Sequence, residues 1–272
     1  MLGAVVGDII GSVYHEGGMK ETDFPLFADV SVPTDDTVLT LAVTEALMMS
    51  MLRRGDKTTG ANFAEKVKSS LRTLCRHYRH VRYGKSFYAW LTAKYPHPFS
   101  SHGNNPAVRV SPVSWAFDDL DSVEWFAEIS AVVTHDHPDG LRGAQCTAGA
   151  VFLSRTGHSK DDIRGYITGR WGYDLSRSLD EIRPGYVYSS SCQDSLPEAF
   201  TAFLEGNNFE DVIRKAVSLG GESDSLAAIS GAIAEPMFGI PTLIQVEAFN
   251  RLQPHMKYIV QKWEQWRDLP EC

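Results

Sequence analysis

Two short clusters of acidic and hydroxyl residues hold the side chains of this sequence that are best suited to chemistry. Thr34-Asp35-Asp36 is one and Glu222-Ser223-Asp224-Ser225 is the other, and each directly precedes an apolar stretch that predicts a buried helix. One explanation is helix capping, because Thr, Ser and Asp at a helix N-terminus stabilise it by about 1 kcal/mol. A cap needs one side-chain oxygen, however, whereas these clusters supply several.

Metal binding explains the surplus of oxygen atoms. Up to four carboxylates beside buried helices would repel one another and lose hydration unless cations neutralised them. Two divalent cations would balance four carboxylates, and a donor set of oxygens without His or Cys suits Mg²⁺ or Mn²⁺ rather than Zn²⁺. Adjacent helical residues point about 100° apart. Asp35 and Asp36 could therefore serve two ions about 3.5–4 Å apart, the spacing of two-metal hydrolytic sites.

Helices must position these clusters, and most of the sequence predicts helix. Gly3, Gly7 and Gly11 share one helix face and predict the close approach of another backbone, with Asp8 beside that face. Residues 95–112 are expected to form a functional loop, and 157–191 show no clear pattern. The other expected helices cover 35–49, 62–80, 121–133, 140–154, 194–204, 209–219, 226–234 and 245–266. Because no strand or repeat is convincing, the predicted class is all-α.

Composition sets the remaining limits. The 272 residues are 43% hydrophobic and 22% charged, which is typical of a globular protein and compatible with one domain over 1–272. The net charge of −8 argues against a nucleic-acid-binding surface. No uncharged apolar run is long enough to span a membrane, and Asp8 interrupts the apolar N-terminus, which lacks the basic start of a signal peptide. Four separated cysteines, at 75, 146, 192 and 272, predict reduced thiols in a cytoplasmic protein.

Five motifs occur in a fixed order along the chain. They are Gly7-Asp8-Ile9-Ile10-Gly11, Thr34-Asp35-Asp36-Thr37, Gly103-Asn104, Thr134-His135-Asp136-His137-Pro138 and Gly220-Gly221-Glu222-Ser223-Asp224-Ser225. The series resembles the ADP-ribosylglycohydrolase family, which includes the dinitrogenase reductase-activating glycohydrolases, from about residue 1 to Pro241. The resemblance implies a compact orthogonal helical bundle with two Mg²⁺ or Mn²⁺ ions. It also implies hydrolysis of the bond between ADP-ribose and an acceptor, either a modified protein or a small ADP-ribosyl compound.

The resemblance also implies roles for individual residues. Gly103, Asn104 and His135 would contact ADP-ribose. A general base would take the proton of the attacking water; Glu16 or a carboxylate at the ions, which could be Asp35, Asp36 or Glu222, could serve. The ligands carried over by position are Thr34, Asp35, Asp36, Glu222, Asp224 and Ser225. Because this set is complete in one chain, a monomer is expected.

The sequence departs from the family pattern in four places. Glu222 stands where the family usually has Asp, so its carboxylate reaches one methylene further, and Ser225 replaces Thr but keeps the hydroxyl. Many relatives have Glu directly after the residue equivalent to Tyr14, whereas here His15 follows and the acid comes next, at Glu16. Asn105 takes the third position of the Gly-Asn-Gly pattern. Either Glu16 or His15 takes the role of the glutamate that relatives have after the residue equivalent to Tyr14, or the activity is altered.

Two alternatives belong to other functional classes. His135-Asp136, in a chain with further histidines at 77, 80, 102 and 137, is similar to the ligand pattern of helical metal-dependent phosphohydrolases, but that explanation leaves both acidic clusters unused. The second alternative is a family member that binds ADP-ribose or serves a structural role without turnover. Retained affinity for ADP-ribose in the absence of hydrolysis would indicate it.

Overall fold

The computed structural model describes residues 1–15, 18–50 and 60–268. Within these ranges the regular structure is helical, and the only β-type pairs are two isolated bridges, Phe99–His135 and Gly103–Ser191. The all-α class is therefore confirmed. The helices are α1 (Leu2–Gly11), α2 (Asp35–Ser50), α3 (Gly60–His77), α4 (Lys85–Thr92), α5 (Asn105–Arg109), the 3₁₀ helix η2 (Ser111–Trp115), α6 (Leu120–Val132), α7 (Pro138–Arg155), α8 (Lys160–Trp171), α9 (Leu179–Ile182), α10 (Cys192–Glu205), α11 (Phe209–Val217), α12 (Ser223–Phe238), α13 (Thr242–Arg251) and α14 (Pro254–Arg267).

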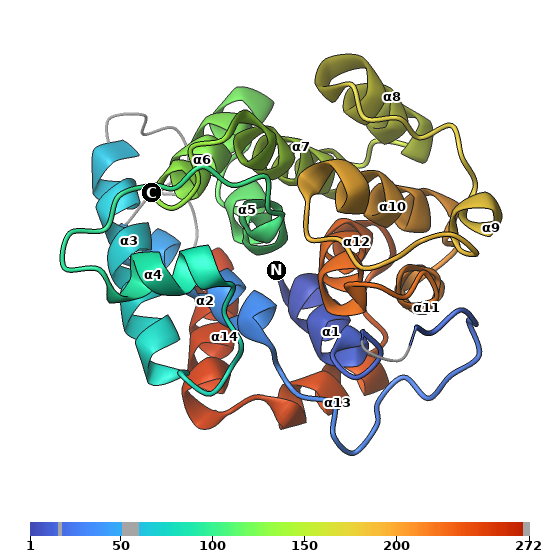
Figure 1. Cartoon of the computed structure of the whole chain (residues 1–272), viewed down its shortest axis with the longest axis horizontal. Helices are drawn as coiled ribbons and strands as arrows, with labels where there is room; N and C mark the ends of the chain where they lie inside the picture. Colours follow the sequence, from blue (N-terminus) through green and yellow to red (C-terminus); the bar gives the residue numbers. More distant parts are fainter. Residues whose placement is uncertain (16–17, 51–59, 269–272) are drawn as a thin grey trace.

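Helices α1 and α12 lie side by side at the centre of the fold (Figure 1). A Cβ atom built at Gly7 would lie 2.1 Å from the carbonyl oxygen of Ala227, and Gly3 and Gly11 are almost as close to the backbone of α12. Real side chains do not approach a backbone oxygen so closely, so only glycine is compatible with this contact. The close approach predicted from the glycine spacing is confirmed, and its partner is the helix that follows the second acidic cluster.

Helix α2 is the second central element, packed between α3, α5 and α14 (Figure 1). It is buried on nearly all sides from Asp36 to Leu47, as its continuous apolar pattern predicts. Thr34 precedes it and accepts a hydrogen bond of 3.2 Å from the backbone N–H of Asp36, which is the capping contact expected of a threonine at that position.

The loop that precedes α5 contacts the loops that precede α7, α10 and α12, through the bridges Phe99–His135 and Gly103–Ser191 and the hydrogen bond from Asn104 to Glu222. Helix α7 packs against α5, α6 and α12, whereas α10 and α11 cover the other side of α12. Gly220 and Gly221 both adopt positive φ angles, of 69° and 64°, in the turn that leads into α12. Side-chain-bearing residues rarely adopt this conformation, so the two glycines allow the chain to enter α12 with its acidic residues turned inward.

The structure corrects three expectations. Residues 245–266 are two helices rather than one, because Pro254 lacks a backbone N–H and starts α14 after the break at Leu252–Gln253. The expected loop over 95–112 contains α5 and begins η2, each with a proline in its first turn. The unclear region 157–191 contains α8 and α9, both of which begin with a serine capping box.

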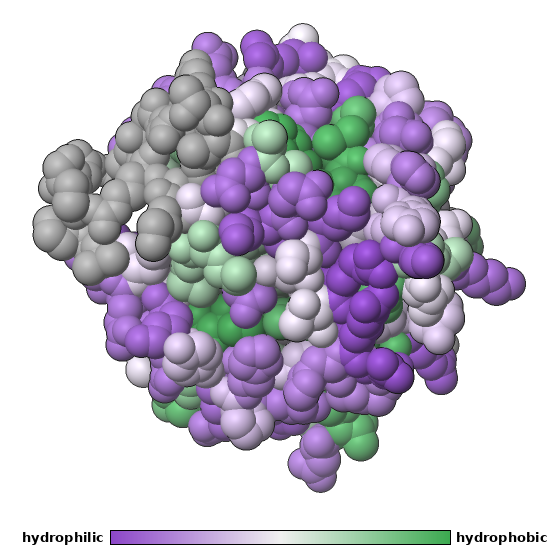
Figure 2. All heavy atoms as spheres, turned by 90° about the vertical axis from the view of Figure 1, so that its left-hand side faces the viewer, coloured by the Kyte–Doolittle hydropathy of each residue, from purple (hydrophilic) through white to green (hydrophobic). Residues whose placement is uncertain are grey.

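The surface shows no extended apolar area on the face seen in Figure 2, which is mainly hydrophilic with small separate hydrophobic patches. None of the described helices is long and apolar enough to cross a lipid bilayer. Cys75, Cys146 and Cys192 are buried free thiols, in agreement with the prediction of reduced cysteines. Cys272 lies outside the described residues.

Candidate active site

The N-terminal turns of α2 and α12 meet, and their carboxylates form one cluster. The Ser225 hydroxyl donates a 2.6 Å hydrogen bond to Asp36 Oδ2. Carboxylate oxygens of Asp8, Asp36 and Asp224 all lie within 4.8 Å of one another. The two acidic clusters, 186 or more positions apart in the sequence, thus contribute to one buried acidic centre beside the α1–α12 contact.

Asp8 is a member of this centre to which the sequence assigned no role. It is fully buried and accepts four hydrogen bonds, from the backbone N–H and the hydroxyl of both Thr34 and Thr37. Four bonds are about the capacity of a carboxylate. Asp8 therefore holds the first turn of α2 in place. In the sequence, only its position beside the glycine face of α1 indicated a role for Asp8. Its partners, Thr34 and Thr37, lie 26 and 29 residues away, so the sequence does not reveal these hydrogen bonds.

Glu222 is held at the edge of the acidic centre by two side chains. Asn104 donates from Nδ2 to Oε2 over 2.8 Å, and the Tyr188 hydroxyl donates to Oε1 over 3.0 Å. The same Asn104 amide donates to the Ser195 hydroxyl on α10, and the side chain is buried. Asn104 thus reaches the site as predicted, but in this structure it orients Glu222. Sequence reasoning missed Tyr188 and Ser195, which carry no motif.

Burial raises the pKa of every acid in the centre, and repulsion by neighbouring carboxylates adds to the shifts of Asp8, Asp35, Asp36 and Glu222. For Glu222, burial is the largest cause and raises the pKa to about 7, although hydrogen bonds from Asn104 and Tyr188 oppose the shift. Burial, followed by the charges of Asp224 and Asp8, raises the pKa of Asp35 well above its usual range. Asp36 responds in the same direction, with Asp35 as its strongest neighbour. The centre therefore concentrates negative charge that a cation would stabilise.

The donor set fits hard divalent cations. In the described part of the chain, no lysine or arginine pairs with the carboxylates of this centre. Asp36 and Asp224 each accept one hydrogen bond, from the Ser225 hydroxyl and the Ser225 N–H respectively, which leaves lone pairs for a ligand. Carboxylate and hydroxyl oxygens are the ligands that Mg²⁺ and Mn²⁺ prefer.

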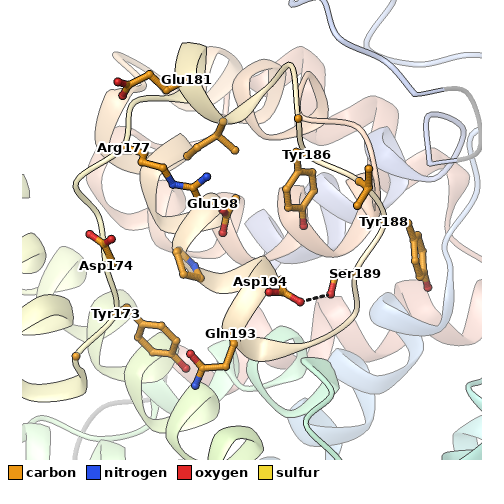
Figure 3. A pocket seen from close by; sticks show the side chains of 15 residues that line it. Tyr173, Asp174, Arg177, Glu181, Tyr186, Tyr188, Ser189, Gln193, Asp194 and Glu198 are labelled. Atoms are coloured by element: carbon orange, nitrogen blue, oxygen red, sulfur yellow. Dashed lines mark hydrogen bonds and ion pairs between the residues drawn. The ribbon is translucent and has the colours of Figure 1, made fainter.

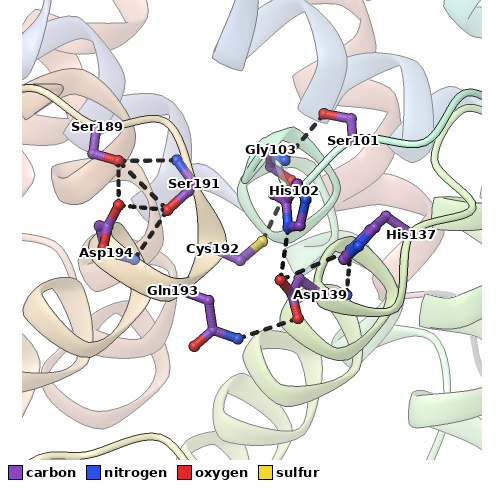
Figure 4. A network of polar contacts seen from close by, with 10 residues as sticks. All are labelled: Ser101, His102, Gly103, His137, Asp139, Ser189, Ser191, Cys192, Gln193 and Asp194. Atoms are coloured by element: carbon purple, nitrogen blue, oxygen red, sulfur yellow. Dashed lines mark hydrogen bonds and ion pairs between the residues drawn. The ribbon is translucent and has the colours of Figure 1, made fainter.

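Gly103 lies in a loop that is joined to the start of α10 (Figure 4). The backbone N–H of Cys192 donates to the carbonyl of His102 over 2.8 Å, and that of Asn104 donates to the carbonyl of Ser190 over 2.9 Å. The Cys192 thiol also donates to the carbonyl of Gly103. These bonds connect the predicted substrate loop to the segment that carries Tyr188.

His135 is buried behind that loop and faces Gly103. Arg109 donates to the Thr134 hydroxyl over 2.9 Å, and this hydroxyl lies 2.8 Å from His135 Nδ1. A Cβ built at Gly103 would lie 3.7 Å from His135 Nε2. Burial and the charge of Arg109 lower the pKa of His135 to about 3, so the ring is neutral at ordinary pH. His135 thus supports the loop from behind.

The phosphohydrolase alternative receives no support from the geometry. Among the residues described, two groups of side chains are close enough to share an ion, and neither includes His135 or Asp136. The second group is His102, His137 and Asp139, in which Asp139 accepts a hydrogen bond from His102 over 2.9 Å and another from Gln193 (Figure 4).

The region after Tyr14 is seen only in part. His15 donates from Nδ1 to the carbonyl of Ser12 over 2.9 Å, and its charge lowers the pKa of Asp224, so His15 lies beside the acidic centre. Glu16, one of the predicted catalytic residues, lies outside the described residues.

An all-helical fold with an acidic centre between two helix N-termini defines the class of this protein. The sequence model of the ADP-ribosylglycohydrolases matches residues 1–254, and the chain belongs to that family of glycohydrolases. A solved structure titled ADP-ribosylglycohydrolase-related protein complex has the same fold, with a TM-score of 0.67 and 21% sequence identity. It covers 98% of this chain and 97% of its own.

Three relatives show the range of similarity. The mouse ADP-ribosylhydrolase ARH3 is 26% identical over 88% of this chain and 83% of its own length. The ADP-ribosylarginine hydrolase Tri1 of Pseudomonas putida is 28% identical over 52% of this chain and 40% of its own. An uncharacterised protein of Archaeoglobus fulgidus is 34% identical over 47% of each chain, so this match spans about half of that relative.

Proposed function

We propose that this protein hydrolyses the glycosidic bond between ADP-ribose and an acceptor side chain, arginine in the first place, and so reverses ADP-ribosylation. Two Mg²⁺ or Mn²⁺ ions would be required. The names of the mouse and Pseudomonas relatives support this class of substrate, and the Pseudomonas name specifies arginine. The observation that carries the proposal is the meeting of the two acidic helix starts at Ser225 and Asp36.

The acidic centre supplies the residues that would hold the ions. Bound there, the ions would orient the ribose hydroxyls and lower the pKa of a water molecule. Asp8 is not included among them, because its hydrogen-bonding capacity is used by Thr34 and Thr37. The proposed ligands are Thr34, Asp35, Asp36, Glu222, Asp224 and Ser225.

The chain's own residues supply the rest of the chemistry. The bond between the anomeric carbon and the acceptor breaks, the electron pair leaves with the acceptor, and a water oxygen bonds to the carbon. Carboxylates beside the ribose stabilise the positive charge that develops. The water proton passes to Asp35, Asp36, Glu222 or Glu16, and the acceptor nitrogen or oxygen ends protonated. Asn104 and Tyr188 fix the carboxylate of Glu222 during this transfer.

Turnover of a defined substrate tests the proposal. ADP-ribosylated arginine is incubated with the protein and Mg²⁺ or Mn²⁺, and free ADP-ribose is measured. Asp36→Asn should abolish release. Glu247→Gln, which alters a partly buried ion pair with Arg251 on α13, serves as a control and should behave like the wild type. Absence of release by the wild type, beside an active relative, would contradict the proposal.

The second candidate function is binding of ADP-ribose without hydrolysis. It is motivated by two departures from the family pattern, Glu222 in place of Asp and His15 directly after Tyr14. Calorimetry with ADP-ribose, run beside the turnover assay, separates the two. Saturable binding without release of ADP-ribose would indicate a binding protein.

A further inference from the structure

Two histidines and an aspartate gather at the edge of the predicted substrate loop, and none of the three belongs to the acidic centre. His102 lies in the loop before α5, whereas His137 and Asp139 lie at the start of α7. One side-chain ligand atom of each lies within 4.8 Å of the other two, and in Figure 4 both imidazole rings lie beside the Asp139 carboxylate. We call these three residues the histidine cluster.

The spacing of the ligand atoms in the histidine cluster suits a transition-metal ion. His102 Nδ1 lies 2.9 Å from Asp139 Oδ2, and His137 Nδ1 lies 3.8 Å from the same oxygen. Two ligand atoms of a tetrahedral Zn²⁺ ion, each about 2.0–2.1 Å from the metal, lie about 3.3–3.4 Å apart. The two observed distances lie on either side of this value, so small side-chain rotations would bring the three atoms around one ion.

The two imidazole rings lie against each other, with their centroids 3.7 Å apart and their planes at 42°. Two protonated rings at this distance would repel each other, whereas two neutral rings can each offer a nitrogen lone pair to one ion. Within the described ranges, Asp139 forms ion pairs with these two histidines alone, so no lysine or arginine there competes with a metal for its carboxylate.

Hydrogen bonds orient two of the three side chains. Gln193, in the first turn of α10, donates to Asp139 Oδ1 over 3.2 Å and leaves Oδ2 beside the histidines. The backbone N–H of Asp139 donates to His137 Nδ1 over 3.2 Å, so this nitrogen carries a lone pair rather than a proton. An ion bound at this nitrogen would replace that hydrogen bond. Metal ligands in proteins are commonly held in place by neighbouring hydrogen bonds of the kind that Gln193 makes.

Ions can reach the histidine cluster from solvent. The side chain of His102 is 63% exposed, and those of His137 and Asp139 are 25% and 17% exposed. Gln193 also lines a cavity of about 650 Å³ between α9 and α10, and it lies near Tyr173 at the edge of the hollow in Figure 3. Water can therefore fill the coordination positions that the three side chains leave open.

We propose that His102, His137 and Asp139 bind a divalent transition-metal ion of the zinc type, at a site separate from the acidic centre. Imidazole nitrogen is a ligand that Zn²⁺ favours, whereas Mg²⁺ and Mn²⁺ favour oxygen. The histidine cluster should therefore discriminate against Mg²⁺. The bound ion would join the loop before α5 to the first turn of α7. This inference does not depend on the proposed function, because it concerns metal binding alone.

NMR of the histidine side-chain nitrogens tests the site without any substrate. Protein without a histidine tag is kept in excess Mg²⁺, which supplies the acidic centre with its proposed ion, and Zn²⁺ is then added. We expect the imidazole signals of His102 and His137 to shift and to saturate with Zn²⁺, and not to shift when more Mg²⁺ is added instead. Because the signals belong to these two rings, zinc that binds elsewhere in the protein does not imitate the result.

Two variants remove one ligand each. His102→Ala changes an exposed side chain, and Asp139→Asn keeps the shape of the side chain but removes its charge. Each should weaken the binding of Zn²⁺, measured at His137, at least about tenfold. His158→Ala is the matched control, because His158 is an exposed histidine beside a hydroxyl, that of Thr156, and lies outside the cluster. It should leave the zinc affinity unchanged.

The outcomes distinguish a metal site from a group of hydrogen-bonded side chains. Saturable shifts at both rings that are lost in the two ligand variants support the site. Three results would overturn the inference: no saturable shift of His102 and His137, an equal response to Mg²⁺, or a zinc affinity in His102→Ala and Asp139→Asn equal to that of the wild type. The turnover assay does not affect this decision, so the proposed function and the zinc site can fail independently.

Discussion

Ser225 Oγ donates a 2.6 Å hydrogen bond to Asp36 Oδ2 and so joins two helix starts that are 189 residues apart in the sequence. Both residues are buried, at 3% exposure each. The bond brings the acidic residues of α2 and α12 into one centre, and it uses one lone pair of Asp36. Because lone pairs of Asp36 remain and negative charge is concentrated there, we expect the centre to bind a divalent cation.

Magnesium should stabilise the wild type but not Asp36→Asn. In chelator, the variant is expected to be at least as stable as the wild type, because removing one of several buried carboxylates relieves repulsion. At about 100 times the dissociation constant, magnesium should raise the free energy of unfolding of the wild type by about 2.7 kcal/mol. Thermal unfolding of both proteins, with chelator and with magnesium, measures the difference. Equal stabilisation of the variant would contradict the assignment.

The contact between α1 and α12 should tolerate no side chain at Gly7. Gly7→Ala places a methyl group 2.1 Å from the carbonyl oxygen of Ala227, so the helices must separate, and we expect a loss of about 3 kcal/mol or more. Gly165→Ala is the matched control, because that helical glycine has open space around it and should gain about 0.5–1 kcal/mol. Urea unfolding measures both. Similar behaviour of the two variants would refute the close contact.

A charge at position 104 should disable Glu222. Asn104→Asp replaces the amide that donates to Glu222 with a carboxylate that repels it, so we expect turnover to fall about 10–100-fold. Asn105→Asp introduces the same charge one residue later, in the first turn of α5, where an acid is favourable, and should change turnover by less than about threefold. Steady-state kinetics on the substrate that the wild type hydrolyses gives the comparison. Equal losses of turnover in Asn104→Asp and Asn105→Asp would show that Asn104 does not orient Glu222.

His135 should make the fold sensitive to acid. Its pKa is lowered from 6.5 to about 3 in the folded state, so between these values the unfolded chain binds a proton that the folded protein does not. The contribution of the neutral His135 to the free energy of unfolding is therefore fully present above pH 6.5. It is lost as pH falls, by about 3 kcal/mol at pH 4. Denaturant unfolding at pH 7 and pH 4 measures the loss. Between pH 7 and pH 4, the free energy of unfolding of His135→Asn should fall by about 3 kcal/mol less than that of the wild type. Equal falls in the two proteins would exclude His135 as the cause.

The parts of the site that could be predicted from the sequence are those with local signals. The glycine spacing of α1 and the acidic starts of α2 and α12 each appear within a few residues, so helix periodicity was enough to predict a helix contact and two exceptional helix ends. The role of Asp8 could not be predicted in this way, because the threonines that saturate it come from another helix. Pro254 is a local signal for a helix start, because proline is favoured in the first turn, and it marks the boundary between α13 and α14.

The contact between Tyr188 and Glu222 lies at the other extreme. Residues 172–189 show no periodicity in the sequence, and α9 within them packs against α10, so this contact could not be inferred from the sequence.

The long separation between the two helix starts has a consequence for how the protein is made. Asp8, Asp35 and Asp36 leave the ribosome before Asp224 and Ser225, and helices α3 to α11 are synthesised in between. Until α12 packs on the glycine face of α1, the early acids lack their neighbours and stay hydrated. Binding of the proposed ions would thus require the folded chain, and a product that ends before α12 would bear three of the six proposed ligands, Thr34, Asp35 and Asp36, and bind magnesium weakly.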